Sequence, residues 1–184
     1  MIQRRKVGIV GTGNVGAAAA YALFNQSLAS EIILIDKDER RAEGEAMDLM
    51  HGQILVSSMN VRAGAYPDLA GAQVVILAAG ASQRSPDETR LDLLQRSADI
   101  FRSIIAELDR HAPGAILVVA TNPVDVLTYI AQEISERPPH RIIGTGTLLD
   151  TARFRALLGQ HYGVDPRSVH AYILGEHGDS EVPI

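Results

Sequence analysis

The sequence predicts an α/β fold, in which helices cover both faces of a parallel β-sheet. Short apolar runs of strand length alternate along the chain with longer segments whose apolar residues recur at helical spacing. Several of the short runs are apolar at consecutive positions, as expected of strands that are buried on both faces of a parallel sheet. Because such strands are joined by crossovers through helices, the predicted architecture is a doubly wound sheet.

Each element follows from its local pattern. The expected strands cover residues 6–10, 32–35, 60–63, 73–79, 115–120, 141–144 and 169–174. The expected helices cover residues 17–24, 37–51, 90–110, 123–137 and 148–158. Pro123 suits the first position of a helix, and Pro138 ends that helix. The longest helix carries one apolar stripe, formed by Leu91, Leu94, Ala98, Phe101, Ile105 and Leu108.

The composition limits the class of protein. Of the 184 residues, 46% are hydrophobic and 21% are charged, so the chain can form a packed core in one domain, or in one domain and part of another. The absence of cysteine excludes disulfides and thiolate metal sites and fits a cytoplasmic location, and no metal site is expected. The net charge of −5 and the 4% aromatic content argue against nucleic acid as a partner, and no stretch predicts a membrane span.

A glycine-rich turn after the first strand is the strongest functional signal. Gly11, Gly13 and Gly16 are spaced G-x-G-x-x-G between an apolar strand and a helix. Gly11 can form the tight turn, Gly13 leaves room for a pyrophosphate, and Gly16 allows close packing of the helix on the strand. Asp36 ends the next strand, where its carboxylate can accept hydrogen bonds from ribose hydroxyls and would repel a 2′-phosphate. The motif therefore predicts NAD in preference to NADP.

Polar residues that follow the other strands suggest a reaction. Ligands of doubly wound sheets bind beyond the carboxyl ends of the strands. His177 follows the last expected strand, and a histidine can take the proton that leaves when an alcohol is oxidised by hydride transfer. Asp150 could hold its tautomer, Arg153 could bind a substrate carboxylate, and Arg90 could bring a cation to a substrate carbonyl. Each of these alone could equally be an ordinary surface charge, so the hypothesis rests on the four together.

Five segments resemble the NAD-dependent L-lactate and malate dehydrogenase family, most closely its bacterial L-lactate branch. They are GTGNVG at residues 11–16, QRSPDETR at 83–90, TNPVD at 121–125, LDTAR at 149–153 and GEHGD at 175–179. The resemblance extends over the whole chain. It implies an NAD-binding Rossmann domain over residues 1–145 and the beginning of an α+β substrate domain over residues 146–184. The implied reaction is the reversible reduction of pyruvate to L-lactate by NADH.

The resemblance also implies a role for each motif residue. His177 would be the proton donor and acceptor, Asp150 its orienting partner, and Arg90 the group that polarises the carbonyl. The residues implied to bind the substrate are Gln83, Arg90, Asn122, Asp125 and Arg153. The residues implied to bind the cofactor are Gly11, Gly13, Val15, Gly16, Asp36, Arg41, Tyr66, Gly80, Ala81, Ala120, Thr121, Asn122 and Thr145.

The chain departs from the family pattern in its length and in one loop. The family continues well past the histidine motif, whereas this sequence ends at Ile184, so a truncated, non-catalytic NAD-binding fragment is an alternative. The loop at residues 83–90 is one residue longer than usual, and Asp87 replaces a glycine. Both departures concern the substrate pocket and leave the cofactor motifs intact.

The longer loop leaves malate dehydrogenase as a second alternative. Counting back six residues from Arg90 reaches Arg84, which would pair with a second carboxylate and favour oxaloacetate. Aligning Gln83 instead, with one inserted residue, puts a neutral amide in the pocket and favours pyruvate. Loops accept insertions at little cost, and Glu176 before the histidine resembles the lactate branch, so we expect pyruvate to be preferred.

Two cationic positions suggest regulation. Arg155 and His170 match the positions at which bacterial L-lactate dehydrogenases hold fructose 1,6-bisphosphate across a subunit interface. The resemblance therefore implies a homotetramer that this sugar bisphosphate activates. Without the resemblance, both residues would be interpreted as surface charges.

Overall fold

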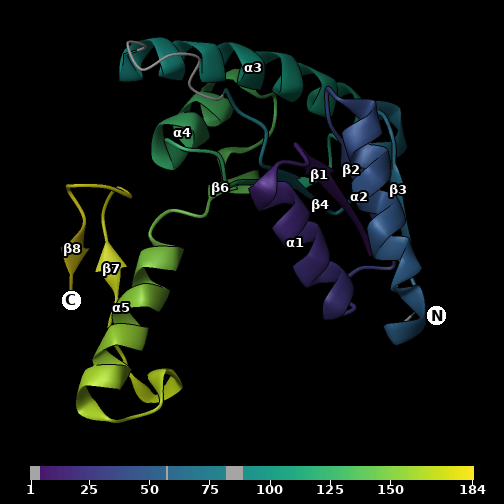
Figure 1. The fold of residues 1–184 in the computed structure, drawn as a ribbon. Coiled ribbons are helices and arrows are strands. Elements are labelled where there is room, and N and C mark those ends of the chain that lie inside the picture. The colour runs from purple at the N-terminus through teal and green to yellow at the C-terminus, as the bar shows by residue number, and fades with distance from the viewer. Residues whose placement is uncertain (1–4, 57, 82–88) are drawn as a thin grey trace.

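Six strands form one parallel sheet, in the order β3-β2-β1-β4-β5-β6 (Figure 1). The computed structural model describes residues 5–56, 58–81 and 89–184. The strands are β1 (Lys6–Val10), β2 (Glu31–Ile35), β3 (Asn60–Ala63), β4 (Val74–Leu77), β5 (Ile116–Val119) and β6 (Ile142–Gly144). The winding reverses between β1 and β4, as in doubly wound dinucleotide-binding sheets. The predicted fold class is confirmed.

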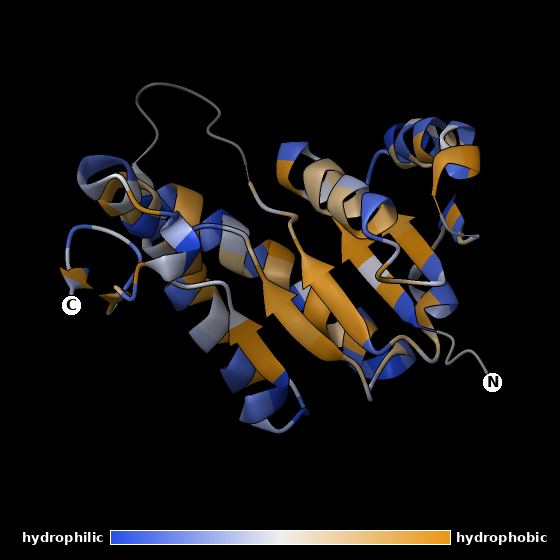
Figure 2. Cartoon of the chain, turned by 90° about the horizontal axis from the view of Figure 1, so that it is seen from below, coloured by the Kyte–Doolittle hydropathy of each residue, from blue (hydrophilic) through white to orange (hydrophobic). Residues whose placement is uncertain are grey.

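The middle strands of the sheet are buried on both faces. β1 pairs with β2 on one side and with β4 on the other, so that Gly8 is in register with both Ile33 and Val75. Both of these neighbours are fully buried, as is Ile32 next to Ile33. Successive side chains of a strand point to opposite faces, which explains why the strands are apolar at consecutive positions. Figure 2 shows this apolar band running through the sheet.

A layer of helices covers each face of the sheet. The helices of these layers are α1 (Asn14–Asn25), α2 (Glu39–His51), α3 (Arg90–His111) and α4 (Val124–Ile134). The first two helices share a buried cluster with Ile32 and Leu34 of β2. The other two share a second cluster with Ile33 and Ile35 of the same strand. Alternate residues of β2 therefore contribute to both cores.

The long helix α3 follows its sequence pattern. Thr89 caps its start, since its hydroxyl oxygen accepts from the Asp92 amide at 3.1 Å while the Asp92 carboxylate accepts from the Thr89 hydroxyl at 2.6 Å. Phe101, Ile105 and Leu108 are at most 1% exposed, which confirms this part of the predicted stripe. In the described residues, short 3₁₀ segments connect other elements at Gln53–Leu55, Tyr66–Leu69, Pro139–Arg141 and Pro166–Ser168.

The C-terminal part of the chain lies apart from the sheet (Figure 1). It consists of α5 (Leu148–Tyr162) and a hairpin of β7 (Ile173–Leu174) and β8 (Val182–Pro183). The prediction of a strand over residues 169–174 was wrong in extent, because β7 pairs only with the short antiparallel β8 and a strand extends only as far as its partner. Helix α5 runs past its predicted end to a left-handed Gly163. In the part of the chain that the structure describes, no helix is both long and apolar enough to cross a membrane.

Candidate cofactor and active site

The glycine turn joins β1 to α1 at the carboxyl edge of the sheet. Gly11 has a φ of 95°, and its amide donates to the Ile35 carbonyl oxygen at 2.7 Å. A Cβ on Gly11 would meet the Ala79 backbone nitrogen at 2.4 Å, and a Cβ on Gly16 would meet the Gly11 carbonyl oxygen at 1.8 Å. Both positions therefore require glycine for the turn and for the packing of the helix on the strand, as the sequence predicted.

Gly13 differs from the two other motif glycines. A Cβ at this position would have no heavy atom within 4 Å among the described residues, and its φ of −66° suits any residue. Gly13 is also the N-cap of α1, and no side chain in the described part of the chain caps that helix. The space beside Gly13 lies at the start of α1, and the helix N-terminus there fits a pyrophosphate group, which binds well to free N–H groups at such a position.

Asp36 lies beside this turn, at the end of β2. Its Oδ2 atom accepts from the Thr12 amide at 2.7 Å and from the Thr12 hydroxyl at 3.0 Å, and its Oδ1 atom accepts from the Asp38 amide at 3.0 Å. Burial raises the pKa of Asp36, but these hydrogen bonds and the nearby charge of Arg41 outweigh burial and hold the pKa below its usual value. The carboxylate is therefore ionised and held beside the glycine turn, and its contact with an adenosine ribose remains a prediction.

The other predicted cofactor residues follow strand ends or lie close to them. Thr121 joins two strand ends, because its hydroxyl donates to the Ala79 carbonyl oxygen at 2.8 Å. A Cβ on Gly80 would meet the Thr121 side chain at 2.5 Å, so these two residues pack together. The amides of Ala120 and Thr145 donate to carbonyls of the neighbouring strands, at 2.9 Å in each case. The structure thus gathers these residues at one edge of the sheet.

Fewer contacts fix the positions of three other predicted cofactor residues. Val15 is 56% exposed on the first turn of α1. Tyr66 begins a 3₁₀ segment after β3 and packs against the core, where burial and the charge of Glu107 raise its pKa. Ala81 follows β4, and its amide donates to the Ser97 hydroxyl at 3.4 Å. Their contacts with a cofactor remain predictions.

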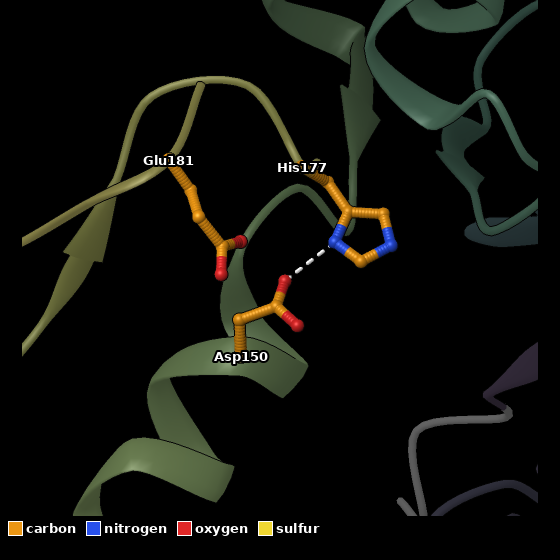
Figure 3. A group of neighbouring side chains, drawn as sticks. All are labelled: Asp150, His177 and Glu181. Carbon is orange, nitrogen blue, oxygen red and sulfur yellow. Dashed lines mark hydrogen bonds and ion pairs between the residues drawn. The ribbon is translucent and has the colours of Figure 1, made fainter. Parts of the chain in front are cut away.

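His177 and Asp150 form the closest polar pair of the site (Figure 3). The His177 Nδ1 atom lies 2.5 Å from the Asp150 Oδ2 atom, and the two side chains are 30% and 10% exposed. Since a carboxylate accepts hydrogen bonds, the hydrogen is on Nδ1 and the Nε2 atom is left for a reacting group. The pair comes from the start of α5 and from the turn between β7 and β8, which are 27 residues apart in sequence. The predicted orienting contact is present.

Asp125 ties the histidine turn to the rest of the protein. Its Oδ2 atom accepts from the His177 amide at 2.8 Å, across 52 residues of sequence. Beside this contact lies a cavity of about 730 Å³, which His177, Asn122, Pro123 and Leu94 help to line. The histidine ring therefore faces a space next to the carboxyl end of β5, large enough for a small substrate.

Arg153 and Glu181 add charges to the same place. The Arg153 Nη1 atom lies 3.3 Å from the Asp150 Oδ1 atom, and the guanidinium side chain is 62% exposed, so it can still turn toward a ligand. Ligand atoms of Asp150, His177 and Glu181 all lie within 4.8 Å of one another (Figure 3). This spacing could hold a metal ion, but the Nδ1 atom that would bind it is already hydrogen-bonded to Asp150. The arrangement fits a proton-transfer pair better.

The remaining predicted site residues are not brought to the histidine by any described contact. Arg90 is the first residue of α3. Gln83 and the rest of the loop up to Glu88 lie outside the described residues. Arg155 is partly exposed on α5, and His170 is exposed ahead of β7. Their roles stay predictions.

Sequence reasoning missed two residues of the site. Thr12 holds Asp36 from within the glycine motif, where only the glycines drew attention. Glu181 reaches the pair of His177 and Asp150 from the far side of a turn that contains Gly178 with a φ of 147°. A carboxylate four residues after the histidine, across a glycine turn, was the available signal for Glu181. The sequence signal for Thr12 was weaker: it is a hydroxyl residue within reach of the acid that ends the next strand.

The chain matches two models of one known protein family. Residues 5–144 match the family model of the lactate/malate dehydrogenase NAD binding domain. Residues 147–184 match the model of the lactate/malate dehydrogenase alpha/beta C-terminal domain.

Several individual proteins are similar over nearly the whole chain. The L-lactate dehydrogenase of Salinibacter ruber is 79% identical over 184 residues, which are 100% of this chain and 58% of that protein. The L-lactate dehydrogenase of Thermus aquaticus is 55% identical over 177 residues, or 96% of this chain and 57% of that protein. A crystal structure of the minor L-lactate dehydrogenase from Enterococcus mundtii, in its ligands-bound form, has a TM-score of 0.93 at 50% identity, covering 97% of this chain and 57% of that one. The chain thus spans well under two thirds of these relatives.

Proposed function

Because this chain belongs to the lactate/malate dehydrogenase family, we propose that it serves the reversible, NAD-dependent reduction of pyruvate to L-lactate. The observation that carries the proposal is the bond from His177 to Asp150, at a cavity beside the edge of the sheet where NAD would lie. The names of the similar proteins support the L-lactate reaction, and none of those described above is a malate dehydrogenase. The family's NAD binding domain supports NAD as the cofactor.

The residues divide the reaction between them. When bound, NADH supplies a hydride to the carbonyl carbon of pyruvate. His177 donates a proton from Nε2 to the carbonyl oxygen as the alcohol forms, and takes it back in the reverse direction. Asp150 keeps the hydrogen on Nδ1 and stabilises the charged imidazolium.

The substrate is held by its carboxylate. Arg153 offers two parallel N–H donors to that group, close to the Asp150 end of the pair. Arg90 brings a second cation to the carbonyl oxygen from the start of α3, and Asn122 lines the same cavity as the histidine. Asp125 contributes by holding the histidine turn through the His177 amide.

The proposal is tested by assaying pyruvate-dependent NADH oxidation. Two proteins are compared: the 184-residue chain, and a chimera in which the sequence after Ile184 comes from the Salinibacter ruber relative. We expect the chimera to turn over pyruvate with a higher kcat/KM than oxaloacetate. A preference for oxaloacetate would assign the discriminating position to Arg84 instead of Gln83. If the chimera turns over pyruvate and the 184-residue chain does not, turnover also needs the part of the relatives that follows the matched residues.

Regulation and assembly complete the proposal. Arg155 and His170 of neighbouring subunits bind fructose 1,6-bisphosphate in a cytoplasmic homotetramer. The domain boundary lies at residues 145 and 146, and the ends of the two family matches, at residues 144 and 147, support it.

The effector site has its own test. The pyruvate KM of the chimera is measured with and without fructose 1,6-bisphosphate, in the wild type and in Arg155→Gln. We expect the effector to lower KM in the wild type only, because the substitution removes a cation that pairs with phosphate. A wild type that ignores the effector would reduce both residues to surface charges.

A further inference from the structure

Thr12 makes an unusual pair of hydrogen bonds inside the glycine turn. Its amide and its hydroxyl both donate to the same oxygen, Oδ2 of Asp36, at 2.7 and 3.0 Å. The residue is 0% exposed, so the hydroxyl cannot touch a bound cofactor in this arrangement. Any effect of Thr12 on cofactor binding therefore acts through Asp36.

The surroundings of Asp36 make its position important. Arg41 is close enough to lower the pKa of the carboxylate, and Lys37 follows it directly in sequence. Cationic groups at this point of a dinucleotide site are suited to binding the 2′-phosphate of NADP. If the Asp36 carboxylate turned away, Arg41 and Lys37 could therefore pair with a 2′-phosphate. Exclusion of NADP requires that Asp36 stays where it is.

We propose that Thr12 is a positioning residue that locks the Asp36 carboxylate and so enforces the choice of NAD over NADP. The hydroxyl fixes one carboxylate oxygen, while the Asp38 amide fixes the other. Turning the carboxylate toward solvent leaves a buried hydroxyl without its acceptor, which adds to the free energy needed to admit a 2′-phosphate. This inference rests on the NAD binding proposed above.

The test compares the dissociation constants of NADH and NADPH, measured by calorimetry on the 184-residue chain. Thr12→Val removes the hydroxyl. It keeps the shape of the side chain and the hydrogen bond from the residue 12 amide to Asp36. We expect it to reduce the preference for NADH about fivefold, which corresponds to roughly 1 kcal/mol, the usual net value of one hydrogen bond. The change should come mainly from tighter NADPH binding. Thr12→Ser keeps a hydroxyl and should keep the wild-type ratio.

Two further variants separate positioning from a general loss of structure. Thr128→Val removes another partly buried hydroxyl, which donates to the Val124 carbonyl oxygen at 2.6 Å within α4, and it should leave the ratio unchanged. In an Asp36→Asn background, Thr12→Val should change the ratio no further, because the charge it positions is gone. Thr12→Ala provides a second test if the valine variant does not fold.

The possible outcomes are distinguishable. If NADH binds the wild type but Thr12→Val leaves the NADH to NADPH ratio unchanged, the role of Thr12 is overturned while the proposed cofactor stands. An equal effect of Thr12→Val with and without Asp36 would also overturn it. Failure of the wild type to bind NADH would overturn the proposed cofactor and this inference together.

Discussion

The sheet region, residues 5–144, and the C-terminal region, residues 147–184, are held together in different ways. In the sheet region two buried clusters enclose strands whose middle residues are fully buried. In the C-terminal region the buried residues are Gly159, Ala171 and Ile173, whereas Leu148, Leu157 and Ile184 are 64–70% exposed. The first region therefore has a core of its own, whereas the second has few buried residues and contributes none to the two clusters. Polar contacts also hold its elements together.

Two polar contacts position the pair of His177 and Asp150. Thr151 accepts from the Ile173 amide at 3.0 Å and so fastens β7 to the first turn of α5. The contact from His177 to Asp125 then fastens the turn after β7 to the sheet region. The comparison suggests that cofactor binding and proton transfer are separable, since the residues for each lie in different regions. The predictions below test that separation and the difference in packing between the two regions.

The largest effect is expected from His177→Asn in the chimera. Asparagine can accept a hydrogen bond but cannot give up and take back a proton near neutral pH, so kcat should fall by roughly 10²–10⁴-fold. NADH binding, measured by calorimetry, should be unchanged, because the residue belongs to the C-terminal region. A variant that retains most of its kcat would remove His177 from the mechanism, and one that loses NADH binding would contradict the separation.

Within the sheet region, two glycines of one motif should respond in opposite ways. Gly16→Ala places a Cβ 1.8 Å from a backbone carbonyl oxygen, and we expect it to lower the free energy of unfolding by about 3 kcal/mol or more. Gly13→Ala has open space and an ordinary φ, so stability should be preserved while NADH binding weakens about tenfold. Urea unfolding and calorimetry measure the two effects. Equal stability of both variants would show that the motif is not packed as described.

The ability of the sequence to predict this structure also differs between the regions. The strands of the sheet and its fold class follow from local apolar patterns, because strands buried on both faces have a distinctive composition. The extent of β7 could not be predicted, since it depends on pairing with residues 182–183 and not on its own apolar run. Side-chain contacts across long sequence separations, such as that from Asp125 to His177, leave no local pattern.

For the site, too, the sequence predicted some features and not others. The glycine turn and Asp36 are close in sequence and have fixed spacing, so the turn, the packing at Gly16 and the acid beside them could be predicted from the residues alone. The partnership of His177 with Asp150 was suggested by chemistry, but their contact depends on how α5 meets the hairpin. Thr12 was overlooked because its role depends on the orientation of one hydroxyl.

The smallest expected effects are changes in the free energy of unfolding on removal of an ion pair, with one pair taken from each region. Hydrogen bonds from the Arg62 side chain and from the Ala65 amide hold the pKa of Asp68 below its ordinary 3.8. The pair therefore stabilises the fold above pH 3.8, and this contribution is lost as the pH falls through the lower folded value. Asp68→Asn should lower the free energy of unfolding at neutral pH, by an amount that shrinks in acid.

The matched variant is Asp165→Asn. The pKa of Asp165 is also lowered, by the Arg167 side chain and then by its amide, but this pair is more exposed than the pair of Arg62 and Asp68. Since exposed ion pairs contribute little, we expect a smaller change in unfolding free energy than for Asp68→Asn. Urea unfolding between neutral and acid pH measures both, and a larger effect at Asp165 would contradict this ranking.

We propose that the sheet region binds NAD and that Asp36 sets the selectivity for NAD over NADP. The most direct measurement is calorimetric titration of the 184-residue chain with NADH and, separately, with NADPH. We predict that NADH binds and that NADPH binds at least an order of magnitude more weakly, since removing a like-charge repulsion of roughly 1.4 kcal/mol is enough for that ratio. Equal affinities for the two cofactors, or no binding of NADH, would contradict the claim.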